Sequence, residues 1–301
     1  MSIQYSLLDV FADAPFQGTQ IPVVILEQSI PESFQISIAS EFKQTETVFI
    51  DKSNPDNPVS VYNARERVPL GAHTTLAASY SAFELGMSQM NGSTASYDFR
   101  ERDQLIHSFV DVKDGKAGSI QFSLSFNATI DSYVPEVSRI AEALNLEEKH
   151  ISFSKYKPLM VSVDHPVLIV PVTRPEHVLA ASLNEPQWNE LLYEIYARDI
   201  LLFAPGSISG ASNFHGRLIN PELARGEYPP IGNVMPEFIG YLSAQADLAY
   251  GTHTFTIDRG SQNTRKSILH AEFDKRPDKA TQCRIGGGVI KMGEGMLHLD
   301  A

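Results

Sequence analysis

The chain has 301 residues, of which 43% are hydrophobic and 20% are charged, a balance typical of a folded globular protein rather than a disordered one. Its formal net charge of −12 argues against a nucleic-acid partner, because binding to a phosphate backbone requires clustered Lys and Arg. The single cysteine, Cys283, excludes an internal disulfide and any site that needs two thiols, and it suits a reducing cytoplasm.

The N-terminus, MSIQYSLLDVF, has no basic region followed by an apolar one, so we expect no signal peptide. No segment offers about 18 uninterrupted apolar residues, so we expect no membrane span. Short strand-like runs then recur through the first half of the chain, at residues 4–10, 23–26, 47–50, 59–63, 105–112 and 119–125. We therefore expect a soluble, cytoplasmic protein rich in strands.

One helix is predicted between the second and third of these strands. Ser29 and Glu32 have the spacing of a capping box, and Pro31 falls in the first turn, where its missing N–H has little effect. Apolar residues follow every four positions and predict a single buried face, made of Phe34, Ile38 and Phe42.

Residues 73–85, HTTLAASYSAFEL, predict a helix that has no polar face. The segment carries no charge before Glu84, is rich in Ala and Ser, and is followed by Gly86, a residue suited to a left-handed cap. A helix of this kind is normally enclosed on all sides. Because its side chains are small, strands can approach it closely, and we expect it to lie at the centre of a curved sheet or barrel.

The second half of the chain repeats the pattern. Helices are predicted at 136–144 and 186–196, and strands at 159–163, 167–172, 200–203, 251–257, 267–273 and 282–289. A second, mostly apolar helix is predicted at 234–244, with Asn233 as N-cap, Pro236 in the first turn and Glu237 near its positive end. The closing segment, VIKMGEGMLHLD, predicts a hairpin that turns on Gly293-Glu294-Gly295.

Both apolar helices follow turns rich in Pro and Gly, at 69–71 and 229–232, which indicates a duplicated architecture. We expect an α+β fold of two pseudo-symmetric domains, each a curved, mostly antiparallel sheet or barrel around a central helix. The predicted boundaries are 1–125 and 126–290, with the final strand near 290–301 returning to the first domain. Two such domains facing each other would bring two helix N-termini into a cleft, which is a site suited to a carboxylate.

Glu46 is the first candidate for chemistry, since it directly precedes an apolar strand. A partly desolvated carboxylate there suits general acid/base catalysis. The alternative is an exposed loop glutamate, which is the commoner situation.

His73 is the second candidate, because it opens the enclosed helix. The helix dipole disfavours a charged imidazole at that end, so the ring would be neutral and able to donate or accept a hydrogen bond. A neutral histidine that polarises a carbonyl is one possibility. A structural capping role is the alternative.

Other features argue against common cofactors. Gly286-Gly287-Gly288 has neither nucleotide-loop spacing nor a G-K-[ST] ending, and it favours a strand bulge or close backbone packing. The nine histidines show no metal-binding spacing, so we expect no metal site.

Six segments of the chain are similar, in the same order, to the motifs of one family. LLDVFADAPFQGTQIPVVIL is similar to D-V-F-x-x-x-P-F-x-G-N-P-x-A-V-V, TETVFI to S-E-T-x-F-V, and VPLGAHTTLAASY to P-F-A-G-H-P-T-L. RLINP is similar to R-x-F-x-P, GSQNTRKS to G-x-x-M-G-R-P-S, and IGGGVIKMGEGMLHL to a terminal V-G-G-x-V hairpin. The chain thus resembles the PhzF-like, phenazine-biosynthesis isomerase-like family, which is related in fold to diaminopimelate epimerase.

The resemblance implies two similar domains, a homodimer, and cofactor-free proton transfer on a small carboxylate substrate. It assigns the proton transfer to Glu46, which would remove a proton from carbon and return it elsewhere, with His73 assisting. Backbone N–H groups at the helix starts would hold the substrate carboxylate, which makes candidate substrate contacts of Thr19, Gly71, Ala72, Tyr228, Gly232 and Asn233.

The chain departs from the family motifs at several of these positions. The family's G-H-P becomes Ala72-His73-Thr74, and its G-N-P becomes Gly18-Thr19-Gln20. The family's E-D-P-A-T-G-S becomes residues 227–233, EYPPIGN, in which Tyr228 replaces the acidic residue. The leading hypothesis is therefore an isomerase with a substrate other than the phenazine precursor. The alternative is a member that binds a small molecule without turnover, or that serves as a dimeric scaffold.

Overall fold

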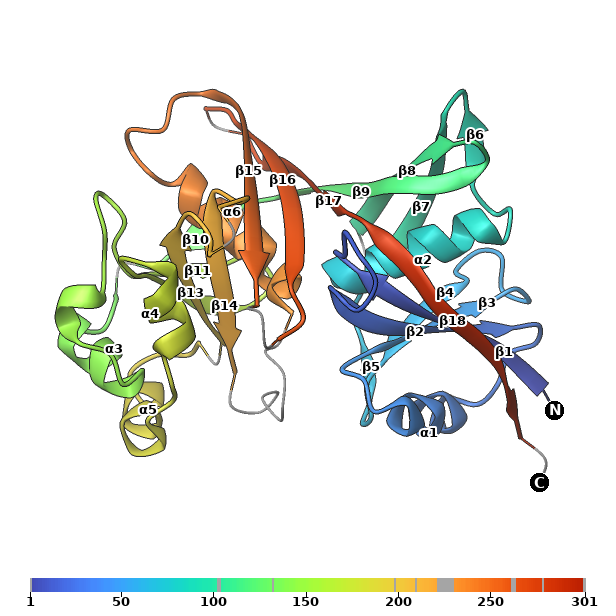
Figure 1. The fold of residues 1–301 in the computed structure, drawn as a ribbon, viewed down its shortest axis with the longest axis horizontal. Helices are drawn as coiled ribbons and strands as arrows, with labels where there is room; N and C mark the ends of the chain where they lie inside the picture. Colours follow the sequence, from blue (N-terminus) through green and yellow to red (C-terminus); the bar gives the residue numbers. More distant parts are fainter. Residues whose placement is uncertain are drawn as a thin grey trace. The chain divides into compact units, whose positions relative to one another are not determined.

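The computed structural model describes residues 2–101, 104–131, 133–197, 199–208, 210–220, 230–260, 264–277 and 279–299. The fold is mixed α/β, with large sheets and few helices (Figure 1). The chain divides into two compact units. Unit 1 comprises Met1–Leu124, Ser267–Leu269 and Arg284–Ala301, and unit 2 comprises Ser125–Lys266 and His270–Cys283.

The first sheet of unit 1 has six strands in the order β18-β1-β2-β3-β4-β5. Their bounds are β1 Ser2–Val10, β2 Thr19–Leu26, β3 Thr47–Asp51, β4 Val59–Tyr62, β5 Arg67–Val68 and β18 Val289–His298. Every adjacent pair is antiparallel except β2 and β3, which are parallel. Parallel neighbours need a crossover connection, and helix α1 (Glu32–Phe42) provides it.

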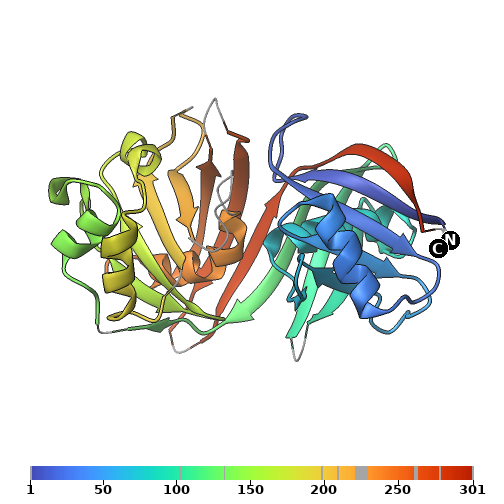
Figure 2. The ribbon, with the colours of Figure 1, turned by 90° about the horizontal axis from the view of Figure 1, so that it is seen from below.

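Helix α1 covers one face of this sheet (Figure 2). It begins at Glu32 with Pro31 as N-cap, and no side chain caps it, so the predicted capping box is wrong. The Ser29 hydroxyl instead donates to Asp51 on the neighbouring strand, which takes it away from the helix. The predicted apolar face is right at Ile38 but not at Phe34, whose side chain is 52% exposed.

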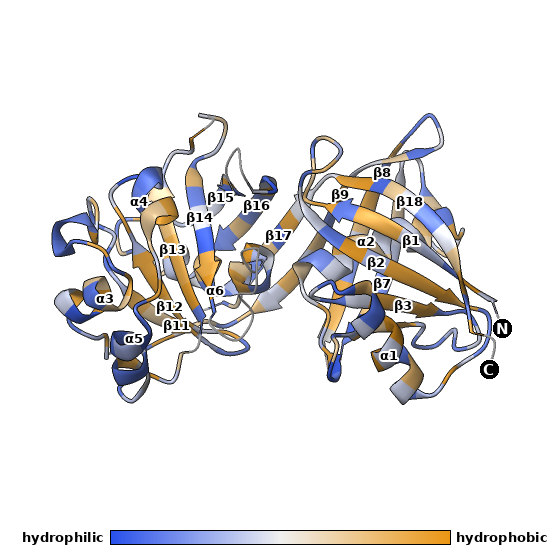
Figure 3. Cartoon of the chain, turned by 60° about the horizontal axis from the view of Figure 1, so that its bottom comes forward, coloured by the Kyte–Doolittle hydropathy of each residue, from blue (hydrophilic) through white to orange (hydrophobic). Residues whose placement is uncertain are grey.

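Helix α2 (Ala72–Glu84) confirms the prediction of an enclosed helix. Nearly all of its residues are buried from Ala72 to Ala82. It ends in a Schellman motif, in which Gly86 has a positive φ of 69° and the Met87 N–H donates to the Ala82 carbonyl. Strands β2 and β3 have α1 on one face and α2 on the other, which explains why they are almost uniformly hydrophobic (Figure 3).

The rest of unit 1 is an antiparallel series of strands. It comprises β6 (Gln89–Asn91), β7 (Thr94–Glu101), β8 (Gln104–Lys113) and β9 (Lys116–Phe126). The residues of β7 do not predict a strand, because polar and charged residues interrupt the apolar positions.

The predicted C-terminal hairpin is wrong. Residues 289–298 form one continuous strand, β18, which pairs with β1 along its length (Figure 1). The register shifts between Leu7, opposite Gly293, and Leu8, opposite Lys291, so Met292 is the extra residue of a bulge. The two glycines that indicated a turn lie inside this strand instead, Gly293 beside the bulge and Gly295 opposite Tyr5.

The strands of unit 2 follow the order β10-β11-β12-β13-β14-β15, and the order continues into β16 and β17, of which Ser267–Leu269 and residues 284–287 belong to unit 1. Their bounds are β10 Thr129–Ile130, β11 Leu159–Ser162, β12 Pro166–Pro171, β13 Asp199–Pro205, β14 Phe214–Ile219, β15 Gly251–Arg259, β16 Ser267–Lys275 and β17 Thr281–Gly287. Parallel pairing joins β12 to β13 and β14 to β15. Helices α3 (Val137–Ala143), α4 (Pro175–Ala180) and α5 (Glu185–Leu192) lie around one apolar core centred on Trp188.

Helix α6 (Met235–Ser243) is the buried helix of unit 2. Pro236 lies in its first turn as predicted, but Val234 and not Asn233 is the N-cap, because a 3₁₀ turn over Ile231–Val234 already includes Asn233. A Cβ on Gly240 would lie 2.5 Å from the Ala128 side chain, so close packing explains the absence of a side chain there. None of the described helices is long and apolar enough to cross a membrane.

Candidate functional site

Glu46 directly precedes β3 and is half-buried rather than exposed. Phe49 packs in the core beneath α1, so strand alternation directs Val48 and Ile50 to the opposite face, toward α2. Glu46 stands two residues before Val48, just outside the strand. Its carboxylate oxygen Oε2 is shielded from solvent. The structure therefore favours a partly desolvated carboxylate at the start of β3.

Thr19 lies at the same edge of the sheet as Glu46. The parallel pairing of β2 with β3 begins at Val23 and Val48, so Thr19 and Glu46 both lie before it, at the same end of the two strands. The Gln44 side-chain amide donates to Gln20 Oε1 at 3.3 Å, which ties the two strand starts together. Thr19 is 8% exposed.

His73 is the second residue of α2 and is fully buried, with both ring nitrogens shielded from solvent. Its ring meets that of Phe11 edge to face, with centroids 4.8 Å apart. Gly71 is the N-cap, and its N–H donates to Thr74 Oγ1 at 2.9 Å. The N–H of Leu70 donates to Glu101 Oε2 at 3.2 Å. The start of α2 is therefore fixed, with first-turn N–H groups that no intrahelical carbonyl can satisfy.

The Gly286–Gly288 run holds Phe11 in place. Phe11 has a positive φ of 58°, and a Cβ on Gly287 would lie 2.6 Å from its ring. A Cβ on Gly288 would lie 2.3 Å from the Ala12 carbonyl oxygen, and that glycine's own carbonyl accepts the Ala12 N–H at 3.1 Å. The prediction of close backbone packing for this run is confirmed.

The remaining residues that are predicted to contact the substrate belong to unit 2. Gly232 is buried and Asn233 is half-buried, both within the 3₁₀ turn before α6. The Asn233 Oδ1 atom is shielded from solvent. Tyr228 lies outside the described residues, so its predicted role stays a prediction.

Sequence reasoning missed a polar cluster around the start of α6, which we call the α6-start cluster: Asp164, His165, Asp199, Asn220 and Glu237. His165 Nε2 lies 3.0 Å from Asp199 Oδ2, and the Asn220 amide donates to Asp199 Oδ1 at 2.6 Å. The Asp164 N–H donates to Glu237 Oε1 at 3.2 Å. These residues come from one turn, two strand ends and a helix start, so only the topology brings them together. The one feature of the sequence that could have indicated the cluster is a glutamate, Glu237, in an apolar helix.

The hydrogen bond to Asp199 raises the pKa of His165, although partial burial opposes the shift. A histidine whose folded pKa lies above its unfolded value of about 6.5 stabilises the fold below that pH, and this stabilisation disappears as pH rises through the folded pKa. We expect His165→Gln to lower the free energy of unfolding by about 0.5–1 kcal/mol near pH 5 and by less near pH 9, since the 43%-exposed ring is screened by solvent. Urea unfolding at both pH values measures this, with the exposed His270→Gln as control; a loss independent of pH would contradict it.

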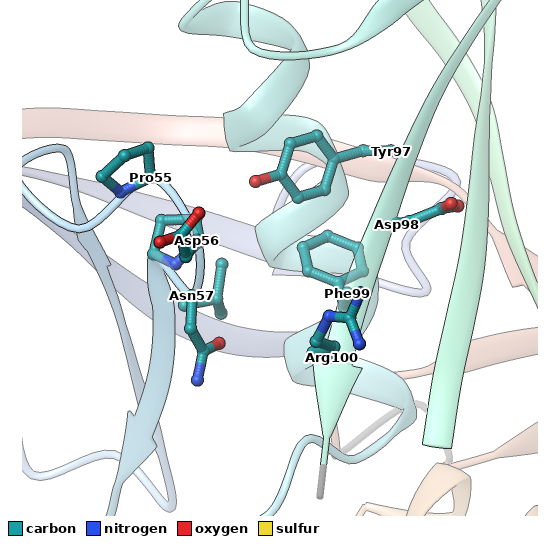
Figure 4. Close-up of a pocket in the computed structure, with 9 residues that line it drawn as sticks. Pro55, Asp56, Asn57, Tyr97, Asp98, Phe99 and Arg100 are labelled. Atoms are coloured by element: carbon teal, nitrogen blue, oxygen red, sulfur yellow. The ribbon is translucent and has the colours of Figure 1, made fainter. Parts of the chain in front are cut away.

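A pocket of about 80 Å³ lies elsewhere in unit 1, lined by residues 55–59 and 97–100 (Figure 4). The Tyr97 hydroxyl points toward the loop of Pro55 and Asp56, whereas Asp98 points away and pairs with His107 at 2.8 Å. None of the predicted site residues lines this pocket. Over the described part of the chain, no group of three or more His, Cys, Asp or Glu side chains is arranged to hold a metal ion.

Comparisons with known proteins show what the chain is similar to. The Mesorhizobium japonicum protein mll1393, named an uncharacterized isomerase, is 24% identical over 303 residues and covers 98% of each chain. A Bacillus anthracis phenazine biosynthesis protein of the PhzF family superposes with a TM-score of 0.82 at 16% identity, covering 99% of this chain and 100% of its own. A hydroxyproline epimerase from Agrobacterium vitis, solved with bound trans-4-hydroxy-L-proline, superposes with a TM-score of 0.64 at 11% identity, covering 99% and 92%.

The model of one protein family, described as phenazine biosynthesis-like protein (PhzC-PhzF), matches residues 8–295. That range includes both enclosed helices, Glu46, His73 and the α6-start cluster. The curated relatives from Mesorhizobium japonicum and Salmonella typhimurium are both named uncharacterized isomerases, and the solved epimerase shares the fold. The chain belongs to the phenazine biosynthesis-like protein family.

Proposed function

We propose that this protein is a cofactor-independent isomerase of a small carboxylated substrate, and that Glu46 is its general acid/base. The observation that carries the proposal is the placement of Glu46, half-buried at the start of β3 with one carboxylate oxygen shielded from solvent. A carboxylate that has lost part of its hydration is a stronger base toward a carbon acid than one in water.

The roles of the other residues follow from their chemistry. Glu46 takes a proton from a substrate carbon, the electron pair left behind moves into the neighbouring unsaturated system, and the same carboxyl returns the proton to a second carbon. His73, a neutral ring in the first turn of α2, offers a hydrogen bond to the charge that develops. The first-turn N–H groups that follow Gly71 favour a substrate carboxylate or oxyanion.

We also propose that the two units are pseudo-symmetric, each a curved sheet around its own helix. The support is that α2 and α6 are each buried in their own unit, and that each is preceded by a turn containing Gly and Pro. In this proposal Thr19, Gly71, Ala72, Gly232, Asn233 and Tyr228 contact the substrate.

Deuterium exchange tests the proposed function. We expect the wild-type chain, in deuterated buffer with a chelator and no added cofactor, to place deuterium on carbon in at least one member of a panel of small carboxylates that includes trans-4-hydroxy-L-proline. Mass spectrometry and proton NMR locate the deuterium. Ligand binding by calorimetry without any exchange across the panel would favour the alternative, a protein that binds a small molecule without turnover.

A further inference from the structure

Glu237 lies in a position that is unusual for a carboxyl group. It is the third residue of α6 and is 1% exposed. Its Oε1 accepts the Asp164 N–H at 3.2 Å, and the carboxyl also interacts with the Glu237 backbone N–H. The carboxyl group therefore turns back toward the start of α6, one helical turn after Asn233, where the positive end of the helix dipole lies.

The groups that face Glu237 compensate the negative charge of its ionised carboxyl only poorly. Asp164 and His165 face it from the turn between β11 and β12, and His165 is already paired with Asp199 at the start of β13. Burial is the largest influence and raises the pKa of Glu237, as does the charge of Asp164, while the backbone N–H groups and His165 act in the opposite direction.

Two acceptor atoms at the start of α6 are buried. Within the part of the chain that the structure describes, Glu237 Oε2 and Asn233 Oδ1 are shielded from solvent and lack any hydrogen-bond partner. A buried carboxylate oxygen without a donor is unfavourable, and protonation of that oxygen relieves the charge. Glu237 is therefore a group whose protonation responds to any further negative charge placed near it.

We propose that the start of α6 binds a carboxylate ligand together with one proton, and that Glu237 is the group that takes up the proton. This inference rests on the proposed function only in taking a carboxylate as the ligand. An anion at the positive end of α6 would share that helix end with the Glu237 carboxyl. Two like charges at one helix end repel each other, and a proton on Glu237 removes the repulsion. Binding of a carboxylate then tightens as the pH falls.

Carbon-13 NMR of the full chain, labelled at the glutamate side-chain carboxyl, tests the proposal with acetate as the probe. The Glu237 signal is identified by its loss in Glu237→Gln, which keeps an acceptor for the Asp164 N–H. If that variant does not fold, Glu237→Asp removes the same signal. We expect acetate to move the titration midpoint of Glu237 to higher pH by about one unit, in a saturable manner, and sodium chloride at equal ionic strength not to do so.

Two controls separate the possible outcomes. The signal of Glu176, exposed on α4, should not respond to acetate. Glu46→Gln should keep the full effect of acetate on the titration of Glu237. Loss of deuterium exchange, which tests the proposed function, is then measured independently of proton uptake by Glu237, which tests this inference. A Glu237 midpoint that acetate leaves unmoved, or that chloride moves equally, would overturn the proposal.

Discussion

Replacing Glu46 by Gln should lower the rate of deuterium exchange into the substrate by about 10²- to 10⁴-fold, the range typical of a lost general acid/base. Gln has nearly the same size and can still accept a hydrogen bond, but it cannot take a proton from carbon. Because one carboxylate oxygen of Glu46 is shielded from solvent, buffer bases have limited access to the position it occupies. We therefore expect little rescue by added acetate or formate.

The matched control is Glu41→Gln, a change of the same chemistry on the exposed end of α1. It should keep the wild-type exchange rate. Urea unfolding should show Glu46→Gln to be folded, with a free energy of unfolding within about 1 kcal/mol of the wild type, since a half-buried side chain keeps its shape. Exchange that persists in Glu46→Gln would remove Glu46 from the proposed chemistry and leave His73 or another group as the base.

The prediction of the enclosed helices succeeded because it depended on composition. In residues 73–83 the absence of charge requires burial wherever the helix lies, and Gly86 marks its end by backbone freedom alone. The strand predictions succeeded for the same reason at β2 and β3, where helices on both faces leave no position for a polar residue.

Predictions that depended on choosing between two local bonds were less successful. Ser29 could cap α1 or bond across to β3, and only the tertiary structure places Asp51 within its reach. Gly293 and Gly295 could form a turn or lie within a strand, and the pairing of β18 with β1 decides for the strand. Short sequence patterns do not contain the identity of the neighbouring strand.

The residues of the candidate site also divide into those that the sequence predicts and those that it does not. Glu46 and His73 could be predicted from the sequence because each stands at the boundary of a strongly patterned element. The α6-start cluster could not, since Asp164, Asp199 and Glu237 are 35 or more residues apart along the chain and meet only through the order of β11, β12, β13 and α6. Only Glu237 gave a signal, as an acid in an otherwise apolar helix.

The largest effect on stability is expected from Gly288→Ala. The new methyl group would lie 2.3 Å from the Ala12 carbonyl oxygen, and a backbone atom cannot move aside as a flexible side chain can. We expect the free energy of unfolding to fall by about 3 kcal/mol, the upper end of the usual range for overpacking. Urea unfolding followed by circular dichroism measures the loss.

Gly293→Ala is the matched control. Gly293 lies on β18, the strand that begins directly after the glycine run, and a Cβ added at Gly293 would have no atom within 4 Å. Since glycine in a strand carries an entropic cost, this change should be neutral or stabilise the fold by up to about 0.5 kcal/mol. Equal losses in the two variants would mean that the Gly288 contact is not responsible.

The Gly288 variant also tests how the fold supports the site. Ala12 follows Phe11, whose ring holds His73 edge to face at 4.8 Å, so a shift of the Ala12 carbonyl displaces the support of the His73 ring. Gly288→Ala should therefore reduce the exchange rate even at temperatures where the variant is fully folded, whereas Gly293→Ala should not. A folded Gly288→Ala variant with wild-type exchange would mean that the position of His73 does not depend on the glycine run, and that this run serves stability alone.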